Sequence, residues 1–307
     1  MRHRVQLIGA LLLLPLAVHA APACAQDVPT TSLPDVVVSG RSLERTVEAF
    51  VDEVTSPPPG HGPARWAQRV CVGVVNLQPE AAQVVIDRVS EAATLINLDS
   101  MGAGCSPNIL VMATDDADGL ARALVRAHPH AFRPRYAGAS QAASKLAAFS
   151  TTSNPIRWWH VSMPVVRGTD VPAVRMPGGR APEIPGSGLL TTEVVNRMRR
   201  SFVILDITKM EGATFQQIGD YVAMVAFAQI DPDAETSSFD TVLNLFSGPQ
   251  LAGQLTEWDR AYLRALYGAY LNERNPMAQL GSVGSLMVRD RRATERANPQ
   301  PDRISRD

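Results

Sequence analysis

Apolar and polar positions along the chain follow helical and strand periods in turn. Leu43, Val47, Phe50, Val51 and Val54 recur at helical spacing, which predicts an amphipathic helix over residues 42–55. The same criteria predict further helices at 79–96, 118–127, 139–149, 189–200, 214–229 and 255–270, and a short helix or turn at 238–246. Buried or half-buried strands are expected at 35–38, 70–75, 109–112, 156–163 and 202–206.

The clearest pattern is an apolar strand at 70–75, a helix at 79–96 and a second apolar strand at 109–112. Continuous apolar strands separated by a helix indicate parallel neighbours that are buried on both faces. The expected fold class is therefore α/β, or α+β, with a mixed sheet that contains a parallel βαβ unit and packs against helices. We expect a single domain over residues 35–272.

Two cysteines flank this unit. Cys71 lies at the start of the first strand, and Cys105 precedes the second. Parallel neighbouring strands begin at the same sheet edge, so a Cα separation of about 5.5 Å is within reach. We predict a structural disulfide closing a 34-residue loop, and a reactive thiol pair is the alternative.

The N-terminus has the layout of a secretory signal peptide. A basic head with Arg2 and Arg4 precedes a largely apolar stretch, residues 5–18, and the small-x-small sequence Ala23-Cys24-Ala25. This stretch is too short for a membrane span, which needs about 20 apolar residues. Residues 1–25 are thus predicted to be removed, which places the chain in the periplasm or outside the cell. A lipoprotein anchored through Cys24 is the alternative.

Charge and composition exclude some partners and mark the ends of the chain. The chain has 29 Lys plus Arg and 30 Asp plus Glu, and loss of Arg2 and Arg4 leaves 27 against 30, a net charge of −3. Nucleic acid is therefore not an expected partner. Residues 26–34 resemble a linker, and the Arg-rich segment 273–307 is predicted to be a disordered tail. The Val-rich segment 35–40 also resembles a TonB-binding box, although too few residues follow for a plugged barrel.

Residues 202–268 carry a resemblance to a known family. A buried strand, a loop with Gly212, an apolar helix and an acidic turn precede Ser237-Ser238-Phe239-Asp240, and a last helix runs from Leu255-Thr256-Glu257-Trp258-Asp259 to Leu266-Tyr267-Gly268. This order resembles the catalytic half of metzincin-type zincin metallopeptidases and uncharacterised secreted bacterial proteins related to them. The resemblance implies a zincin-like C-terminal half.

The departure from that family concerns the metal ligands. In the family the helix bears HExxH, whereas residues 214–229 contain no histidine. The polar side chains there include Asp220 and Tyr221. The others are amides and one thioether, and both of these groups are poor zinc ligands. We therefore expect no metal, no cofactor and no carried-over peptidase activity.

Other catalytic patterns are also missing. No Gly-x-Ser-x-Gly, Ser-x-x-Lys, Walker or Gly-x-Gly-x-x-Gly motif occurs. His160 follows Trp158-Trp159 in a predicted strand and shares a face with Trp158, where cross-strand packing competes with a ligand or acid–base role.

Three functional hypotheses follow. The leading one is an exported, non-enzymatic domain that binds a peptide, protein or envelope component through Trp158, Trp159, His160 and Tyr221, beside a long Pro/Gly-containing connection at 164–188. The second is a hydrolase of unfamiliar design that uses Asp220, Tyr221 and His160, which requires Asp220 and His160 to meet. The third is a structural accessory subunit of an envelope complex, which would expose a large apolar patch.

Overall fold

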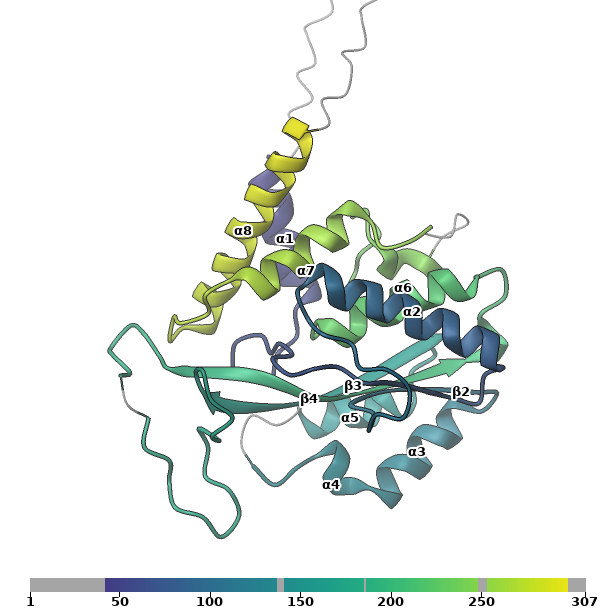
Figure 1. Ribbon diagram of the computed structural model, residues 1–307, viewed down its shortest axis with the longest axis horizontal. Helices are drawn as coiled ribbons and strands as arrows, with labels where there is room; N and C mark the ends of the chain where they lie inside the picture. The colour runs from purple at the N-terminus through teal and green to yellow at the C-terminus, as the bar shows by residue number, and fades with distance from the viewer. Residues whose placement is uncertain (1–41, 137–140, 185, 248–252, 298–307) are drawn as a thin grey trace, which may run out of the picture. The chain divides into compact units, whose positions relative to one another are not determined.

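The structure is a computed structural model that describes residues 42–136, 141–184, 186–247 and 253–297. These ranges form an α/β fold in which helices pack on a mixed sheet (Figure 1). The elements are, in chain order, α1 (Leu43–Val54), β1 (Val72–Val75), α2 (Pro79–Leu95), β2 (Ile109–Thr114), α3 (Ala117–Ala127), α4 (Pro129–Phe132), α5 (Ala143–Phe149), β3 (Ile156–Val166), β4 (Val194–Asp206), η1 (Ile207–Lys209), α6 (Phe215–Phe227), η2 (Val242–Phe246), α7 (Glu257–Gly268) and α8 (Pro276–Ala297).

The sheet has the strand order β1-β2-β4-β3. β1, β2 and β4 run parallel, which confirms the predicted βαβ unit, and β3 pairs antiparallel with β4. The β3–β4 register shifts between Val161 and Ser162. β3 is therefore an edge strand, and the long connection after it closes an antiparallel hairpin.

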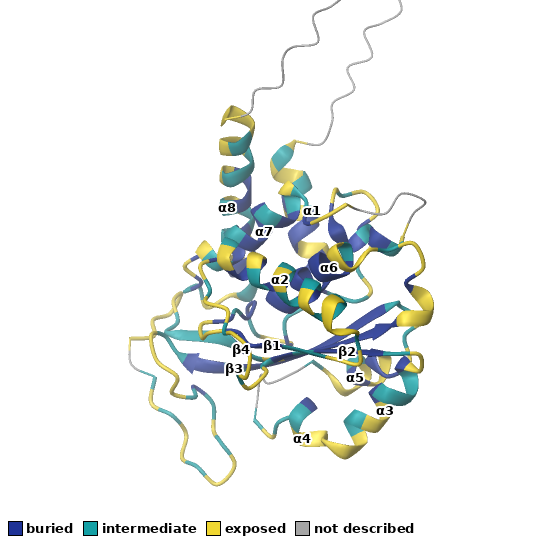
Figure 2. Ribbon diagram, turned by 45° about the vertical axis from the view of Figure 1, so that its right-hand side comes forward, coloured by how far each residue is buried: buried dark blue, intermediate teal, exposed yellow. Residues whose placement is uncertain are grey.

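The two faces of the sheet bury separate clusters. One face packs against α2 and α6 and includes Trp158, Val203 and Leu205, and α7 joins the same cluster through α6. The other face packs against α3, α4 and α5 and includes Trp159 and Phe202. Figure 2 shows α6 as mostly buried between the sheet and α2. Helix α6 begins at a capping box, in which Thr214 accepts from the Gln217 N–H and the Gln217 side chain accepts from the Thr214 N–H.

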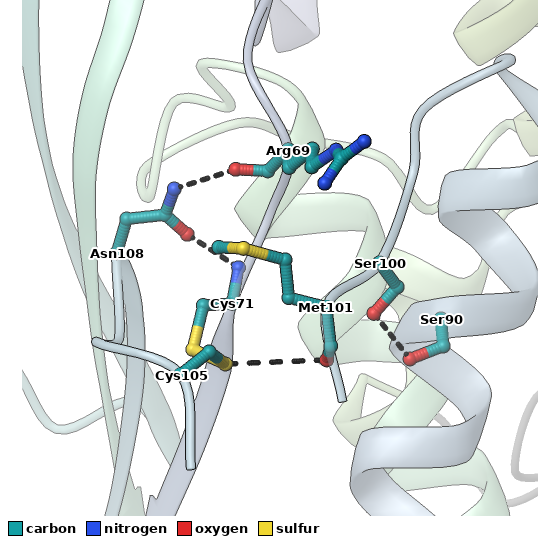
Figure 3. Close-up of a disulfide and its surroundings, with 7 residues drawn as sticks. All are labelled: Arg69, Cys71, Ser90, Ser100, Met101, Cys105 and Asn108. Carbon is teal, nitrogen blue, oxygen red and sulfur yellow. Dashed lines mark hydrogen bonds between the residues drawn. A yellow bond between two sulfur atoms is a disulfide. The ribbon is translucent and has the colours of Figure 1, made fainter. Parts of the chain in front are cut away.

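The disulfide prediction is confirmed. Cys71 and Cys105 are bonded with a Cα–Cα distance of 6.0 Å, within the usual range for disulfides. Asn108 supports the site, because its side-chain oxygen accepts from the Cys71 N–H at 2.8 Å and its amide donates to the Arg69 carbonyl at 3.0 Å (Figure 3). A disulfide in this core is consistent with an oxidising, extracytoplasmic compartment.

The prediction of a helix at 189–200 is wrong. Residues 194–206 form the single long strand β4, paired with β3 from Val166↔Val194 to Ile156↔Leu205. Thr191, Thr192, Val194 and Val195 are β-branched, which favours a strand, and the pairing with β3 overrides the local helical period.

The prediction of a disordered tail over 273–307 is wrong for residues 276–297. Residues 276–297 form helix α8, which buries Leu280, Val283 and Met287. Arg264 of α7 holds Asp290 of α8 with two hydrogen bonds of 3.0 and 2.7 Å. Tertiary packing therefore stabilises this helix, although the glycines and arginines in its sequence interrupt the helical spacing of its apolar residues.

Several predictions fall outside the described residues. These are the signal peptide 1–25 with Cys24, the linker 26–34, the strand at 35–38 with the TonB-box alternative, and the last ten residues. Among the described helices none is long and apolar enough to cross a membrane.

Candidate binding site

A small crevice lies along the outer edge of β3. Its lining includes Trp158 and His160 from one face of the strand and Arg157 and Trp159 from the other. Only the edge of a strand can bring side chains of both faces to one cavity. The cavity volume is about 40 Å³, room for about three water molecules, given that one needs roughly 10–15 Å³.

Trp158 and His160 are anchored against the α6 side of the sheet. The Trp158 indole Nε1 donates to the Ile230 carbonyl at 3.0 Å, and its ring packs edge-on against Tyr221 at 6.0 Å. His160 Nε2 lies 2.6 Å from the Val225 carbonyl, so Nε2 carries the proton and donates. Burial lowers the pKa of His160 to about 4, which keeps the ring neutral at pH 7.

Trp159 and Arg157 point to the opposite face. Trp159 Nε1 donates to the Phe132 carbonyl at 2.8 Å. Arg157 is 2% exposed, and its guanidinium contacts Asp118 at 2.8 Å and donates to the Thr152 carbonyl, also at 2.8 Å. The predicted groove residues Trp158, Trp159 and His160 therefore share one crevice, although they belong to two cores.

Asp220 and Tyr221 are placed differently. The Asp220 carboxylate accepts from Arg88 of α2 at 2.9 and 2.7 Å and from the Leu255 N–H at 3.2 Å. Asp220 thereby ties α6 to α2 and to the start of α7. Tyr221 is buried against Trp158 and Phe246, and burial raises its pKa well above the ordinary range.

The acid–base pair that a hydrolase would need is not formed by these groups. His160 is bonded to the Val225 carbonyl, and Asp220 is bonded to Arg88 and the Leu255 N–H. Since residues 220 and 221 are consecutive on α6, their side chains diverge by about 100°. Asp220 faces α2, whereas Tyr221 faces the sheet, where His160 lies.

The main chain of β3 offers hydrogen-bonding groups at this edge. The Asp206 N–H donates to the Pro155 carbonyl at 2.9 Å, and alternate pairs of an antiparallel ladder exchange hydrogen bonds. Arg157 and Trp159 therefore bond to β4, whereas the main-chain groups of Trp158 and His160 face outward. No strand of the described ranges pairs with that side of residues 156–161.

The crevice is covered by polar contacts between α5 and the segment after α6. Lys145 Nζ lies 3.1 Å from Asp231 and 2.8 Å from Asp233. Gln141 donates to the Ser56 carbonyl, which adds a second contact across the opening. A ligand larger than a few waters requires these contacts to open.

The site also contains Lys145, Arg157 and Gln229, which were not predicted from the sequence. Gln229 lines the crevice and accepts from the Ala64 N–H at 2.8 Å. Arg157 had a recognisable signal, because an arginine inside an apolar strand needs a buried partner. Lys145 had none, since its partners Asp231 and Asp233 are 86 and 88 residues away.

The described residues contain no group of three or more His, Cys, Asp or Glu side chains that could hold a metal ion. The chemistry of the crevice is that of a partly apolar slot with outward amide and carbonyl groups. No protein-family model, curated protein or solved structure matches the chain.

Proposed function

We propose that the protein is an exported, non-catalytic domain with a zincin-like C-terminal half, and that it captures an extended peptide segment along the outer edge of β3. The observation that carries the proposal is an edge strand with outward main-chain groups at Trp158 and His160 beside a crevice lined by aromatic side chains. An added strand satisfies such groups and places alternate side chains in the slot.

The state of the polar groups supports binding over chemistry. His160 donates from Nε2 to the Val225 carbonyl, which leaves the lone pair on Nδ1. Because burial lowers the pKa of His160 to about 4, that nitrogen is a weak general base at pH 7. Asp220 forms an ion pair with Arg88, and this contact gives the carboxylate a structural role. The alternative hydrolase of unfamiliar design would have to rearrange both groups.

The resemblance to zincins supports the same proposal. The strand β4, the capped apolar helix α6, the short helix η2 and the capped helix α7 follow one another along the chain, and this order supports the resemblance. Histidine is missing from α6, so a relative of this kind would retain a peptide-binding edge without zinc chemistry.

The Lys145 contacts make the proposal testable without disturbing the core. Lys145 is partly exposed, and exposed ion pairs contribute about 0–1 kcal/mol each. Lys145→Ala removes them and raises the fraction of molecules with an open crevice, so the apparent affinity for a peptide increases about 3- to 10-fold.

The experiment begins with selection of binders from a random peptide library on the purified protein, followed by calorimetric titration. The matched control is Lys209→Ala, because Lys209 is the only other lysine and pairs locally with Asp206 at 2.8 Å. Tighter binding by Lys145→Ala and unchanged binding by Lys209→Ala support the proposal. A library without binders, or equal affinities for both variants, contradicts it.

One observation favours the structural accessory subunit as a second candidate. Leu189, Leu190 and Tyr270 are 89%, 79% and 65% exposed. They lie in adjoining segments, since the Arg274 N–H donates to the Leu190 carbonyl at 2.9 Å. Co-purification of one envelope protein, lost in Leu189→Ser/Leu190→Ser, would support this function; unchanged co-purification by that variant would remove it.

A further inference from the structure

Helices α1 and α8 lie side by side (Figure 1). A groove of about 670 Å³ is lined by residues of both helices. Glu44 near the start of α1 pairs with Arg292 near the end of α8. At the other end, Asp52 and Met277 line the same groove. The two helices are therefore antiparallel, and residues one turn further along each helix lie at matching heights.

The two walls of the groove carry opposite charge. Glu44, Glu48 and Asp52 follow each other at intervals of four residues along the exposed face of α1. Arg289 and Arg292 stand on the α8 wall. Within the described ranges Glu48, Asp52 and Arg289 have no ion-pair partner in their own chain, as the salt bridges of these helices join other residues.

This arrangement is unfavourable in an isolated chain. Like charges four residues apart on a helix destabilise it by a few tenths of a kcal/mol. Burial, with Glu48 as a smaller contribution, raises the pKa of Asp52. A cation placed over α1 would relieve the repulsion.

The α8 wall leaves space for a neighbouring helix. A Cβ atom added at Gly281 would meet no atom within 4 Å, and Ser285, one turn later, is also exposed. Met277, at the same wall, is 60% exposed. Small residues between an exposed apolar side chain and two arginines let a second helix approach closely.

We infer that this groove is a self-association surface that a second copy of the chain fills, with a two-fold axis parallel to α1 and α8. The rotation places α8 of each copy over α1 of the other at the same height. Arg289 of each copy then faces Glu48 of the other, twice in the interface. This surface is separate from the crevice on β3 and independent of the proposed peptide binding.

A second copy fits this groove better than a foreign basic helix does. A basic helix would satisfy Glu48 and Asp52, but it would face Arg289 and Arg292 on the other wall. Isologous pairing matches each wall with its opposite, which is the requirement of a two-fold interface.

The test is sedimentation velocity over a concentration series, on the protein as its expression host processes it. The wild-type chain is expected to reach twice the monomer mass. Glu48→Arg or Arg289→Glu brings like charges together at both Glu48–Arg289 contacts of the interface, which weakens association by roughly 100-fold. The double variant restores opposite charges at both contacts and therefore restores association. Gly281→Trp blocks the groove and also yields monomer.

Glu211→Arg is the control, because Glu211 is exposed, lies in the turn before α6 and has no ion pair in the described chain. Thermal melts show whether each variant is folded. A wild-type chain that stays monomeric up to about 100 µM, or a folded double variant that stays monomeric, overturns the inference. A monomer that instead binds a basic amphipathic peptide in the groove overturns it as well.

Discussion

Removal of the Cys71–Cys105 disulfide is expected to cost much of the protein's stability. The bridge joins residues 34 positions apart, and chain entropy for a loop of that length corresponds to about 3.8 kcal/mol at 25 °C. Folded domains are stable by only about 5–15 kcal/mol, so this loss is a large fraction of the total. Cys71 is buried, so replacement by alanine adds the cost of a small cavity.

The assay is urea unfolding of three samples: the oxidised chain, the same chain reduced, and Cys71→Ala/Cys105→Ala. Reduction removes the cross-link without removing the sulfur atoms, so the difference between the last two samples isolates the cavity. We expect the reduced chain to lose about 3–4 kcal/mol and to unfold with a larger m-value, because its unfolded state is more expanded.

A change of less than about 1 kcal/mol in the free energy of unfolding on reduction would contradict this expectation. That result would mean that the segment between β1 and β2 is already restricted in the unfolded chain. Asn108 gives an independent check, because it bonds to the Cys71 N–H and the Arg69 carbonyl (Figure 3). Asn108→Ala should cost about 1–3 kcal/mol in the oxidised chain, as it leaves the Cys71 N–H without its acceptor.

Three further predictions concern the core around α6 and α7. Asp220→Asn should lower the free energy of unfolding by about 2–4 kcal/mol, because it breaks the ion pair with Arg88 that joins α2 and α6. A double-mutant cycle with Arg88→Met that shows no coupling energy would contradict this. His160 has a folded pKa of about 4 against an ordinary value of 6.5, so it favours folding above pH 6.5 and destabilises the fold as the pH falls toward 4. The difference in free energy of unfolding between wild type and His160→Gln, measured by urea unfolding at each pH, should change by about 3 kcal/mol over that window. A difference that stays constant with pH would be evidence against this. Thr256→Ala removes the side-chain cap of α7 and should cost about 0.5–2 kcal/mol by thermal melting, more than the exposed Thr151→Ala.

The local patterns of the chain were sufficient to predict the parallel core. The apolar runs of β1 and β2 predicted a parallel pair, and the apolar run at 202–206 predicted a buried strand that lies in β4. The placement of Cys71 and Cys105 at the starts of β1 and β2 predicted the disulfide. Each of these features depends on residues within one βαβ unit or at its ends, so short-range patterns carry the information.

Features set by long-range pairing were not predictable in the same way. The first half of β4 owes its strand conformation to β3, and α8 owes its order to α1 and α7. Among the predicted site residues, Trp158, Trp159 and His160 line one crevice, whereas Asp220 pairs with Arg88. No sequence pattern connects Lys145 with Asp231 across 86 residues.

The proposed function requires that an extended peptide pairs with the outer edge of β3. Amide hydrogen exchange, measured residue by residue with and without a selected peptide, tests it most directly. We predict that the amides of Trp158 and His160, which face outward, become strongly protected, whereas those of Arg157 and Trp159, which already bond to β4, change little. Equal protection of all four amides, or no protection at Trp158 and His160 with the peptide bound, would contradict strand pairing at this edge.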